Sequence, residues 1–222
     1  METEHNKSCD DSGTSYVLER NYEFCGQNLW ISQSSDSQLG TSGFVWDAGI
    51  ALCRYFEKQR IIFTDMKVIE LGSGTGIVGI LAVLLGGNVT ITDQPNVLKQ
   101  IEHNVTASIP TSCRDRVNIR ALSWGHDHVR FPCDYDFILG GEIVYFKKTY
   151  PLLLKTLLHL SSERTIIYLS SKMWEDFQIN NFYENILPEY FNCQLVHRNE
   201  EDDINIYKVT KKSPSTGDQL ET

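Results

Sequence analysis

Short apolar runs alternate along the chain with amphipathic stretches, and this pattern predicts an α/β protein. Five runs rich in apolar and β-branched residues indicate buried strands at 67–71, 88–92, 117–122, 135–140 and 165–170. Apolar side chains at helical spacing predict helices at 46–56, 77–85, 95–108, 149–160 and 175–187. Because parallel neighbours in a sheet need a crossover connection, strands separated by helices predict a mainly parallel sheet.

Strands without an intervening helix are predicted at both ends of this pattern. Residues 16–32 alternate loosely around Gly26, which predicts an N-terminal β-hairpin. Strands at 193–197 and 204–209 are joined by a short acidic turn, which predicts an antiparallel C-terminal hairpin. A dinucleotide dehydrogenase would continue with β-α-β units at this point. The predicted fold is therefore the seven-strand Rossmann-like methyltransferase fold, mostly parallel, with the C-terminal antiparallel hairpin and an added N-terminal hairpin.

Composition adds boundaries to this picture. Residues 1–15 and 211–222 are polar, so we expect both to be disordered and residues 16–210 to form one methyltransferase domain. A chain of 222 residues suffices for one such domain with a substantial core. No apolar run approaches the roughly 18–20 residues that cross a bilayer. The first residues also lack the basic start and apolar stretch of a secretory signal, so a cytoplasmic location is the default expectation.

Charge and cysteine content narrow the partners. With 20 basic and 29 acidic residues the net charge is −9, which argues against a nucleic acid, whose phosphates need clustered Lys and Arg. An acidic surface would attract a basic protein, although it also keeps a protein soluble. We expect a monomer with a protein substrate and no membrane contact. The cysteines form no Cys-x-x-Cys pair, so neither a metal site nor a disulfide is expected from Cys9, Cys25, Cys53, Cys113, Cys133 and Cys193.

The strongest local signal is the segment Glu-Leu-Gly-Ser-Gly-Thr-Gly at 70–76, between a predicted strand and a predicted helix. Gly72 and Gly74 would let the backbone approach a ligand closely, with Ser73 between them. The free N–H groups of the following helix would point at the same ligand. Asp93 lies 21 positions after Gly72, at the end of the next strand, where its carboxylate can accept hydrogen bonds from both ribose hydroxyls. Together these features predict a cofactor that contains adenosine.

NAD and S-adenosylmethionine both fit that prediction, and three observations favour S-adenosylmethionine. Glu70 places a negative charge where a pyrophosphate would be repelled and where an ammonium and a sulfonium would be attracted. The glycine spacing is G-x-G-x-G rather than G-x-G-x-x-G, although Gly79 leaves some ambiguity. The C-terminal hairpin fits the methyltransferase topology alone.

The motifs VIELGSGTGIVGI, VTITD, ALSWG and GGEIVY, in this order, make the chain resemble the family 16 (methyltransferase-like 21) protein lysine methyltransferases. The similarity runs from about Phe24 to Val209. It implies that Trp46 lies near the methionine end of the cofactor and that the turn at 72–74 wraps the methionine portion. It further implies that Asp93 binds the ribose, that Trp124 lies beside the adenine, and that Gly141 contributes backbone to the pocket.

Glu142 and Tyr145 match an Asp/Glu-x-x-Tyr motif that, by the resemblance, shapes the slot for the target lysine. Free lysine has a pKa of about 10.4, so its amine is almost fully protonated at neutral pH. A sulfonium and an apolar slot disfavour the ammonium, and Glu142 could orient the amine while Tyr145 walls the slot. Enzymes that methylate amines of nucleic-acid bases or glutamine carry an Asn/Asp-Pro-Pro-aromatic motif at this position. This chain has no proline between Gly140 and Tyr145, which argues against that class of enzyme.

The resemblance also implies a substrate and a location. It points to a lysine of translation elongation factor 1-alpha, in the cytoplasm and at the centrosome. A lysine of another protein, such as a chaperone, and a cofactor-binding interaction module without catalysis are the alternatives that the motifs leave open.

Overall fold

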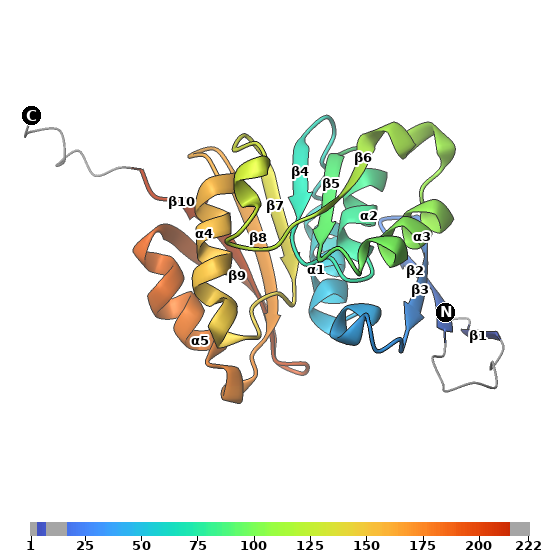
Figure 1. Cartoon of the computed structure of the whole chain (residues 1–222). Coiled ribbons are helices and arrows are strands. Elements are labelled where there is room, and N and C mark those ends of the chain that lie inside the picture. Colours follow the sequence, from blue (N-terminus) through green and yellow to red (C-terminus); the bar gives the residue numbers. More distant parts are fainter. Residues whose placement is uncertain (1–3, 8–16, 214–222) are drawn as a thin grey trace, which may run out of the picture.

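A seven-stranded sheet runs through the molecule in the order β6-β5-β4-β7-β8-β10-β9 (Figure 1). The computed structural model describes residues 4–7 and 17–213. The first five strands in this order pair in parallel, and β10 is antiparallel to both of its neighbours. The bounds are β4 (Lys67–Glu70), β5 (Asn88–Asp93), β6 (Val117–Ala121), β7 (Phe137–Gly141), β8 (Ile166–Lys172), β9 (Phe191–Asn199) and β10 (Ile204–Lys211). The predicted fold, including the C-terminal antiparallel hairpin, is confirmed.

The sheet has an apolar core on each face, because its central strands are buried on both sides. Val68 belongs to one core cluster and the next residue, Ile69, to the other, as the period of two along a strand requires. The first cluster contains side chains of α1 (Asp47–Gln59), α2 (Ile77–Leu84) and α3 (Leu98–Ser108). The second contains side chains of α4 (Tyr150–Leu160) and α5 (Ile179–Asn181). Helices therefore cover both faces of the sheet.

The predicted N-terminal hairpin is present as β2 (Val17–Phe24) and β3 (Gln27–Ser34), which pair antiparallel. Asn104 of α3 fixes this hairpin to the main domain, because its buried amide accepts a hydrogen bond from Ser32 N (2.8 Å) and donates one to Ser32 O (3.1 Å). A 3-10 turn at Gly40–Gly43 follows β3 and leads the chain to the start of α1. This path brings the segment before α1 toward the carboxyl ends of the strands.

Two predicted helices differ from the structure. Residues 95–97 form a turn, so α3 begins at Leu98, and the Asn96 amide in this turn donates a hydrogen bond to Gln38 O (2.6 Å). The predicted helix at 175–187 is broken into short helical turns, of which α5 is one. Gln178 interrupts it, because its φ of +54° is left-handed and stops a right-handed helix.

The predicted disordered ends fall mostly outside the described residues. Within residues 1–15 the structure describes a short strand, β1 (Glu4–Lys7), which pairs antiparallel with β2. At the other end, β10 continues to Lys211, one residue into the predicted tail. No helix in the described part of the chain is long and apolar enough to span a membrane.

Candidate active site

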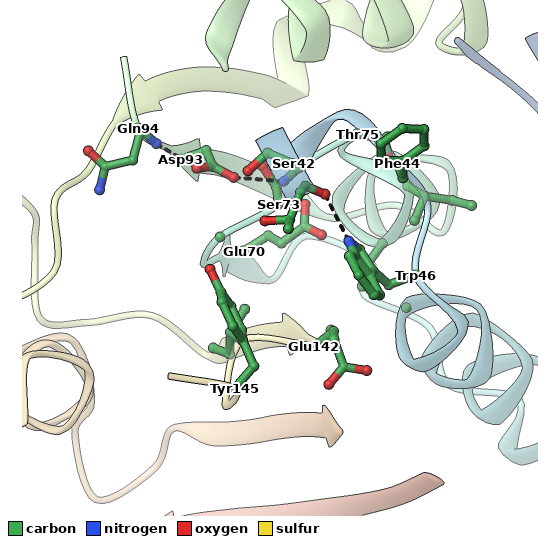
Figure 2. A pocket seen from close by; sticks show the side chains of 18 of the residues that line it. Ser42, Phe44, Trp46, Glu70, Ser73, Thr75, Asp93, Gln94, Glu142 and Tyr145 are labelled. Atoms are coloured by element: carbon green, nitrogen blue, oxygen red, sulfur yellow. Dashed lines mark hydrogen bonds between the residues drawn. The ribbon is translucent and has the colours of Figure 1, made fainter. Parts of the chain in front are cut away.

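A cavity of about 210 Å³ opens at the carboxyl ends of β4, β5 and β7 (Figure 2). The strand order reverses between β4 and β7, and open α/β sheets bind ligands at such a switch point. All ten residues that the sequence analysis proposed for the site line this cavity: Trp46, Glu70, Gly72, Ser73, Gly74, Asp93, Trp124, Gly141, Glu142 and Tyr145. In Figure 2, Asp93 lies on one side of the pocket and Glu142 and Tyr145 lie on the opposite side.

The turn between β4 and α2 needs its glycines for two separate reasons. Gly72 and Gly74 both have a φ of +56°, a left-handed conformation that a side chain disfavours. A Cβ at Gly72 would also lie 3.0 Å from Cζ2 of Trp124, so the indole ring packs directly on this turn. The turn thus exposes backbone to the cavity and packs against the indole ring of Trp124.

Asp93 ends β5 and is almost fully buried at the edge of the cavity. Its Oδ2 accepts a hydrogen bond from Gly74 N (2.7 Å), and its Oδ1 accepts one from Gln94 N (2.7 Å). Burial raises the pKa of Asp93 above its ordinary value, while these two backbone N–H groups act in the opposite direction. The carboxylate is therefore fixed in one orientation, with each oxygen retaining capacity to accept a further hydrogen bond.

Glu70 lines the cavity and is almost fully buried, with 2% of the residue exposed. Its Oε2 accepts a hydrogen bond from Gly79 N (3.0 Å), which ties β4 to α2. Burial raises the pKa of Glu70 well above its ordinary value, with Asp93 adding to the shift. A cationic group in the cavity would favour its ionised form. A Cβ at Gly79 would lie 2.4 Å from Oε2 of Glu70, so Gly79 makes room for this carboxylate.

Glu142 follows β7 and combines burial with an unusual backbone conformation. Its φ is +61°, which is rare for a residue with a side chain and is found where the surrounding structure enforces it, often at functional sites. The side chain is turned inward, with the residue 9% exposed, and both carboxylate oxygens accept hydrogen bonds from Lys172 N (3.3 and 3.2 Å). Burial raises the pKa of Glu142 to about 7, although the Lys172 backbone N–H and ammonium oppose this shift.

Aromatic side chains form the open part of the wall. Trp46 precedes α1 and is 40% exposed, and its Nε1 donates a hydrogen bond to Thr41 O (2.9 Å). Tyr145 lines the same cavity, and burial raises the pKa of its phenol. The 3-10 turn after β3 therefore positions the Trp46 ring over the cavity.

Further residues that were not predicted from the sequence also line the cavity. They come from the segment before α1, from α1 and α2, from the ends of strands and from the turn before α4. Gln94 could have been found, because it directly follows a predicted site residue. Five others lie inside the quoted motifs and could have been found in the same way: Thr75, Ile77, Val78, Leu122 and Ile143. The remaining residues gave no local signal: Thr41, Ser42, Phe44, Gly49 and Thr149.

Residues 4–7 and 17–213 contain no cluster of three or more potential metal ligands. The five cysteines in these ranges are free thiols: Cys25, Cys53, Cys113, Cys133 and Cys193. Cys9 lies outside the described residues.

Gly141 offers a test of how closely the cavity walls pack. A Cβ at this position would lie 2.9 Å from Gly49 Cα, where backbone cannot move aside easily. We expect Gly141→Ala to reduce the free energy of unfolding by about 1–3 kcal/mol, measured by urea denaturation. Gly49→Ala is the matched control, because its Cβ would make ordinary contacts of 3.7 Å with Ile77 in a helix that favours alanine. Equal stability of the two variants would contradict the predicted clash.

Comparison with known proteins agrees with this geometry. The sequence profile of a family described as lysine methyltransferase matches residues 23–188. EEF1A lysine methyltransferase 3 of Xenopus tropicalis is 52% identical over 196 residues, which cover 88% of this chain and 87% of that protein. Protein N-lysine methyltransferase METTL21A of Xenopus tropicalis is 40% identical over 188 residues, which cover 85% of this chain and 86% of that protein.

A solved structure shares the fold at low identity. A putative RNA methyltransferase from Pyrococcus horikoshii superposes with a TM-score of 0.55 at 17% identity, over 76% of this chain and 84% of that chain. At such identity the likeness concerns the fold alone. The family profile and the close relatives span the glycine turn, Asp93 and the Glu142 segment, which confirms the resemblance inferred from the motifs. The chain therefore belongs to the lysine methyltransferase family and is an S-adenosylmethionine-dependent protein-lysine methyltransferase.

Proposed function

We propose that this enzyme methylates a lysine of translation elongation factor 1-alpha in the cytoplasm. One observation supports the chemistry above all others: the glycine turn and Asp93 share a single cavity with Glu142 and Tyr145. The residues assigned to the methyl donor and those assigned to the lysine are therefore adjacent, as a direct transfer between two bound molecules requires.

The cavity fits S-adenosylmethionine by an observation independent of the motifs. Ser73 Oγ is buried, lines the cavity and has no hydrogen-bond partner among the described residues, so it is available to a ligand. In our proposal Asp93 accepts hydrogen bonds from the ribose hydroxyls, the turn at 72–74 binds the methionine portion, and Glu70 attracts its ammonium. Trp124 covers the adenine, Gly141 contributes backbone, and Trp46 contacts the methionine end. When bound, this cofactor supplies an activated methyl group.

The protein's own contribution at the other side is to prepare the amine. Only a neutral amine has the lone pair that attacks a methyl group, and loss of hydration together with the nearby sulfonium lowers the pKa of an ammonium. Glu142 is positioned to accept a hydrogen bond from this amine and to orient it, because its carboxylate lies in the cavity wall opposite Asp93. Tyr145 encloses the same slot. Holding the reactants in line could supply roughly 7–11 kcal/mol of the barrier reduction.

The choice of substrate is supported by the relatives. Those that are 52% and 47% identical, from Xenopus tropicalis and Mus musculus, are both named for lysine methylation of EEF1A. The proteins named METTL21A are 34–40% identical. The net charge of −9 also suits a basic protein surface better than a nucleic acid.

A labelling experiment tests this proposal. The purified enzyme is incubated with S-adenosylmethionine carrying a labelled methyl group and with either purified elongation factor 1-alpha or cell extract. We expect one main labelled protein in both reactions, the elongation factor, with label recovered as methyl-lysine. An elongation factor whose lysines have been blocked chemically is the control substrate and should remain unlabelled. A different labelled protein in the extract, with the elongation factor unlabelled, would refute the proposed substrate.

A further inference from the structure

A second hollow of about 360 Å³ adjoins the cofactor cavity and shares four of its lining residues, Thr41, Trp46, Glu142 and Tyr145. Three further aromatic side chains complete it: Phe146, Trp174 and Phe177. We call this hollow, with its seven lining residues, the aromatic basin. All five of its aromatic residues are substantially exposed. Such a group of exposed aromatic rings beside a catalytic cavity indicates a binding surface.

The outer wall of the basin is held in place by hydrogen bonds. Trp174 N donates to Lys172 O (3.0 Å), directly after β8. The Tyr150 hydroxyl of α4 donates to Phe177 O (2.9 Å). Lys147 Nζ donates to the side chain of Gln178 (2.7 Å), the residue with left-handed backbone that follows Phe177. The rings of Trp174 and Phe177 therefore lie on a segment that hydrogen bonds hold in place, which lowers the entropy cost of binding a ligand.

The electrostatics of the basin favour an ammonium group. Lys172 Nζ already lies 4.9 Å from the centroid of the Trp174 ring, which shows that this indole accepts an ammonium over its face. Glu142 places a carboxylate in the basin wall. Asp47, with an exposed side chain, lies 4.0 Å from Lys172 Nζ and so offsets its positive charge at the rim. An incoming cation therefore meets aromatic faces and acidic groups.

The composition of the basin also favours a long apolar stem. Its wall is mainly aromatic carbon, with Glu142 and two hydroxyl groups, those of Thr41 and Tyr145, as the polar side chains that line it. A lysine side chain combines four methylene groups with a terminal ammonium and buries its stem against apolar surface. The basin leads such a side chain to Glu142 and Tyr145, because these two residues line both hollows.

We propose that the aromatic basin binds the side chain of the target lysine, with Trp174 and Phe177 as its outer wall and as specificity-determining residues. The inference rests on the proposed lysine chemistry and adds two residues that lie outside every motif in the sequence. The occupant of the basin is the alkyl ammonium side chain of a lysine on a protein substrate.

Steady-state kinetics with elongation factor 1-alpha tests the role of the outer wall. We expect Trp174→Ala to raise KM for the protein substrate about tenfold, with a smaller change in kcat and an unchanged Kd for S-adenosylmethionine. Trp174→Phe should recover part of this loss, because a ring remains. Trp30→Ala is the matched control, since Trp30 is similarly exposed, 46% against 43%, but lies in β3 outside the basin. A KM equal to that of the wild type in Trp174→Ala would overturn the proposal.

A titration with a small probe separates this inference from the choice of protein substrate. N-acetyl-lysine-N-methylamide is added to the enzyme saturated with S-adenosylhomocysteine, while the indole N–H signals are followed by NMR. We expect the signals of Trp174 and Trp46 to shift and that of Trp30 to stay in place. The norleucine analogue, which lacks the ammonium, should cause much smaller shifts. Shifts confined to other tryptophans, or equal shifts with both probes, would refute the basin even if the elongation factor is methylated.

Discussion

Asp93→Ala should weaken binding of S-adenosylmethionine at least about 100-fold and reduce methyl transfer below detection, because two charged hydrogen bonds of roughly 1.5–3 kcal/mol each are lost. In the wild type, Gly74 N and Gln94 N each donate a hydrogen bond to one oxygen of Asp93 and so orient the carboxylate toward the ribose hydroxyls. Removing it also leaves these two N–H groups without an acceptor at the edge of the cavity. Isothermal titration with the cofactor, together with the labelling assay, measures both effects.

Asp136→Ala is the matched control for this experiment. Asp136 Oδ2 likewise accepts a backbone hydrogen bond, from Lys67 N (2.8 Å), but it does so at the amino end of β4 and away from the cavity. Its loss should reduce stability without changing cofactor affinity. Asp93→Asn should be intermediate, because one amide oxygen replaces two carboxylate oxygens and the NH₂ group would face a backbone donor. Wild-type affinity in Asp93→Ala would mean that the cofactor binds elsewhere.

Most of the fold could be predicted from the sequence, because its signals are local and strong. The central parallel strands are buried on both faces and therefore contain continuous apolar runs, as Phe137–Gly141 and Ile166–Lys172 illustrate. The break in the helix predicted at 175–187 was missed, since its cause is the left-handed backbone at Gln178, which no residue preference announces. Glutamine is an ordinary helix former, and tertiary contacts override that preference.

The cofactor side of the cavity was more predictable than the lysine side. Gly72, Gly74 and Asp93 have a fixed spacing, because a backbone turn and a strand end impose it. By contrast, Trp174 and Phe177 reach the basin only because β8 lies beside β7 in the sheet. A long-range neighbour of this kind leaves no periodicity in the sequence. The same holds for the burial of Glu142, whose carboxylate packs against the backbone N–H of Lys172 in β8.

Glu142→Gln should lower kcat about 100-fold, in the range that a misplaced acid–base or orienting group causes. In the wild type, burial raises the pKa of Glu142 to about 7, so the carboxylate form that can accept a hydrogen bond from an ammonium is lost as the pH falls through 7. The profile of kcat/KM against pH should therefore rise with a midpoint near pH 7 in the wild type. This limb should be absent from Glu142→Gln, because glutamine does not titrate.

The same substitution should stabilise the protein at alkaline pH, and this effect distinguishes a functional carboxylate from a structural one. The pKa of this carboxyl group is 4.5 in the unfolded chain and about 7 in the folded one, so the folded protein binds more protons between these pH values. The free energy of unfolding therefore decreases as the pH rises from 4.5 to about 7. The full cost, about 3 kcal/mol, applies above pH 7 and vanishes below pH 4.5. Glu142→Gln removes this cost while its amide oxygen can still accept a hydrogen bond from Lys172 N.

Urea denaturation at pH 8 and at pH 4 should thus show a Glu142→Gln variant that is more stable than the wild type at pH 8 and equally stable at pH 4. Glu102→Gln, which alters an exposed carboxyl of α3, serves as the control and should match the wild type in stability and in rate at both values. A variant that is both slower and less stable at pH 8 would show that Glu142 serves the fold. A slower but more stable variant means that the chain maintains a buried charge, at a cost in stability, because the reaction requires it.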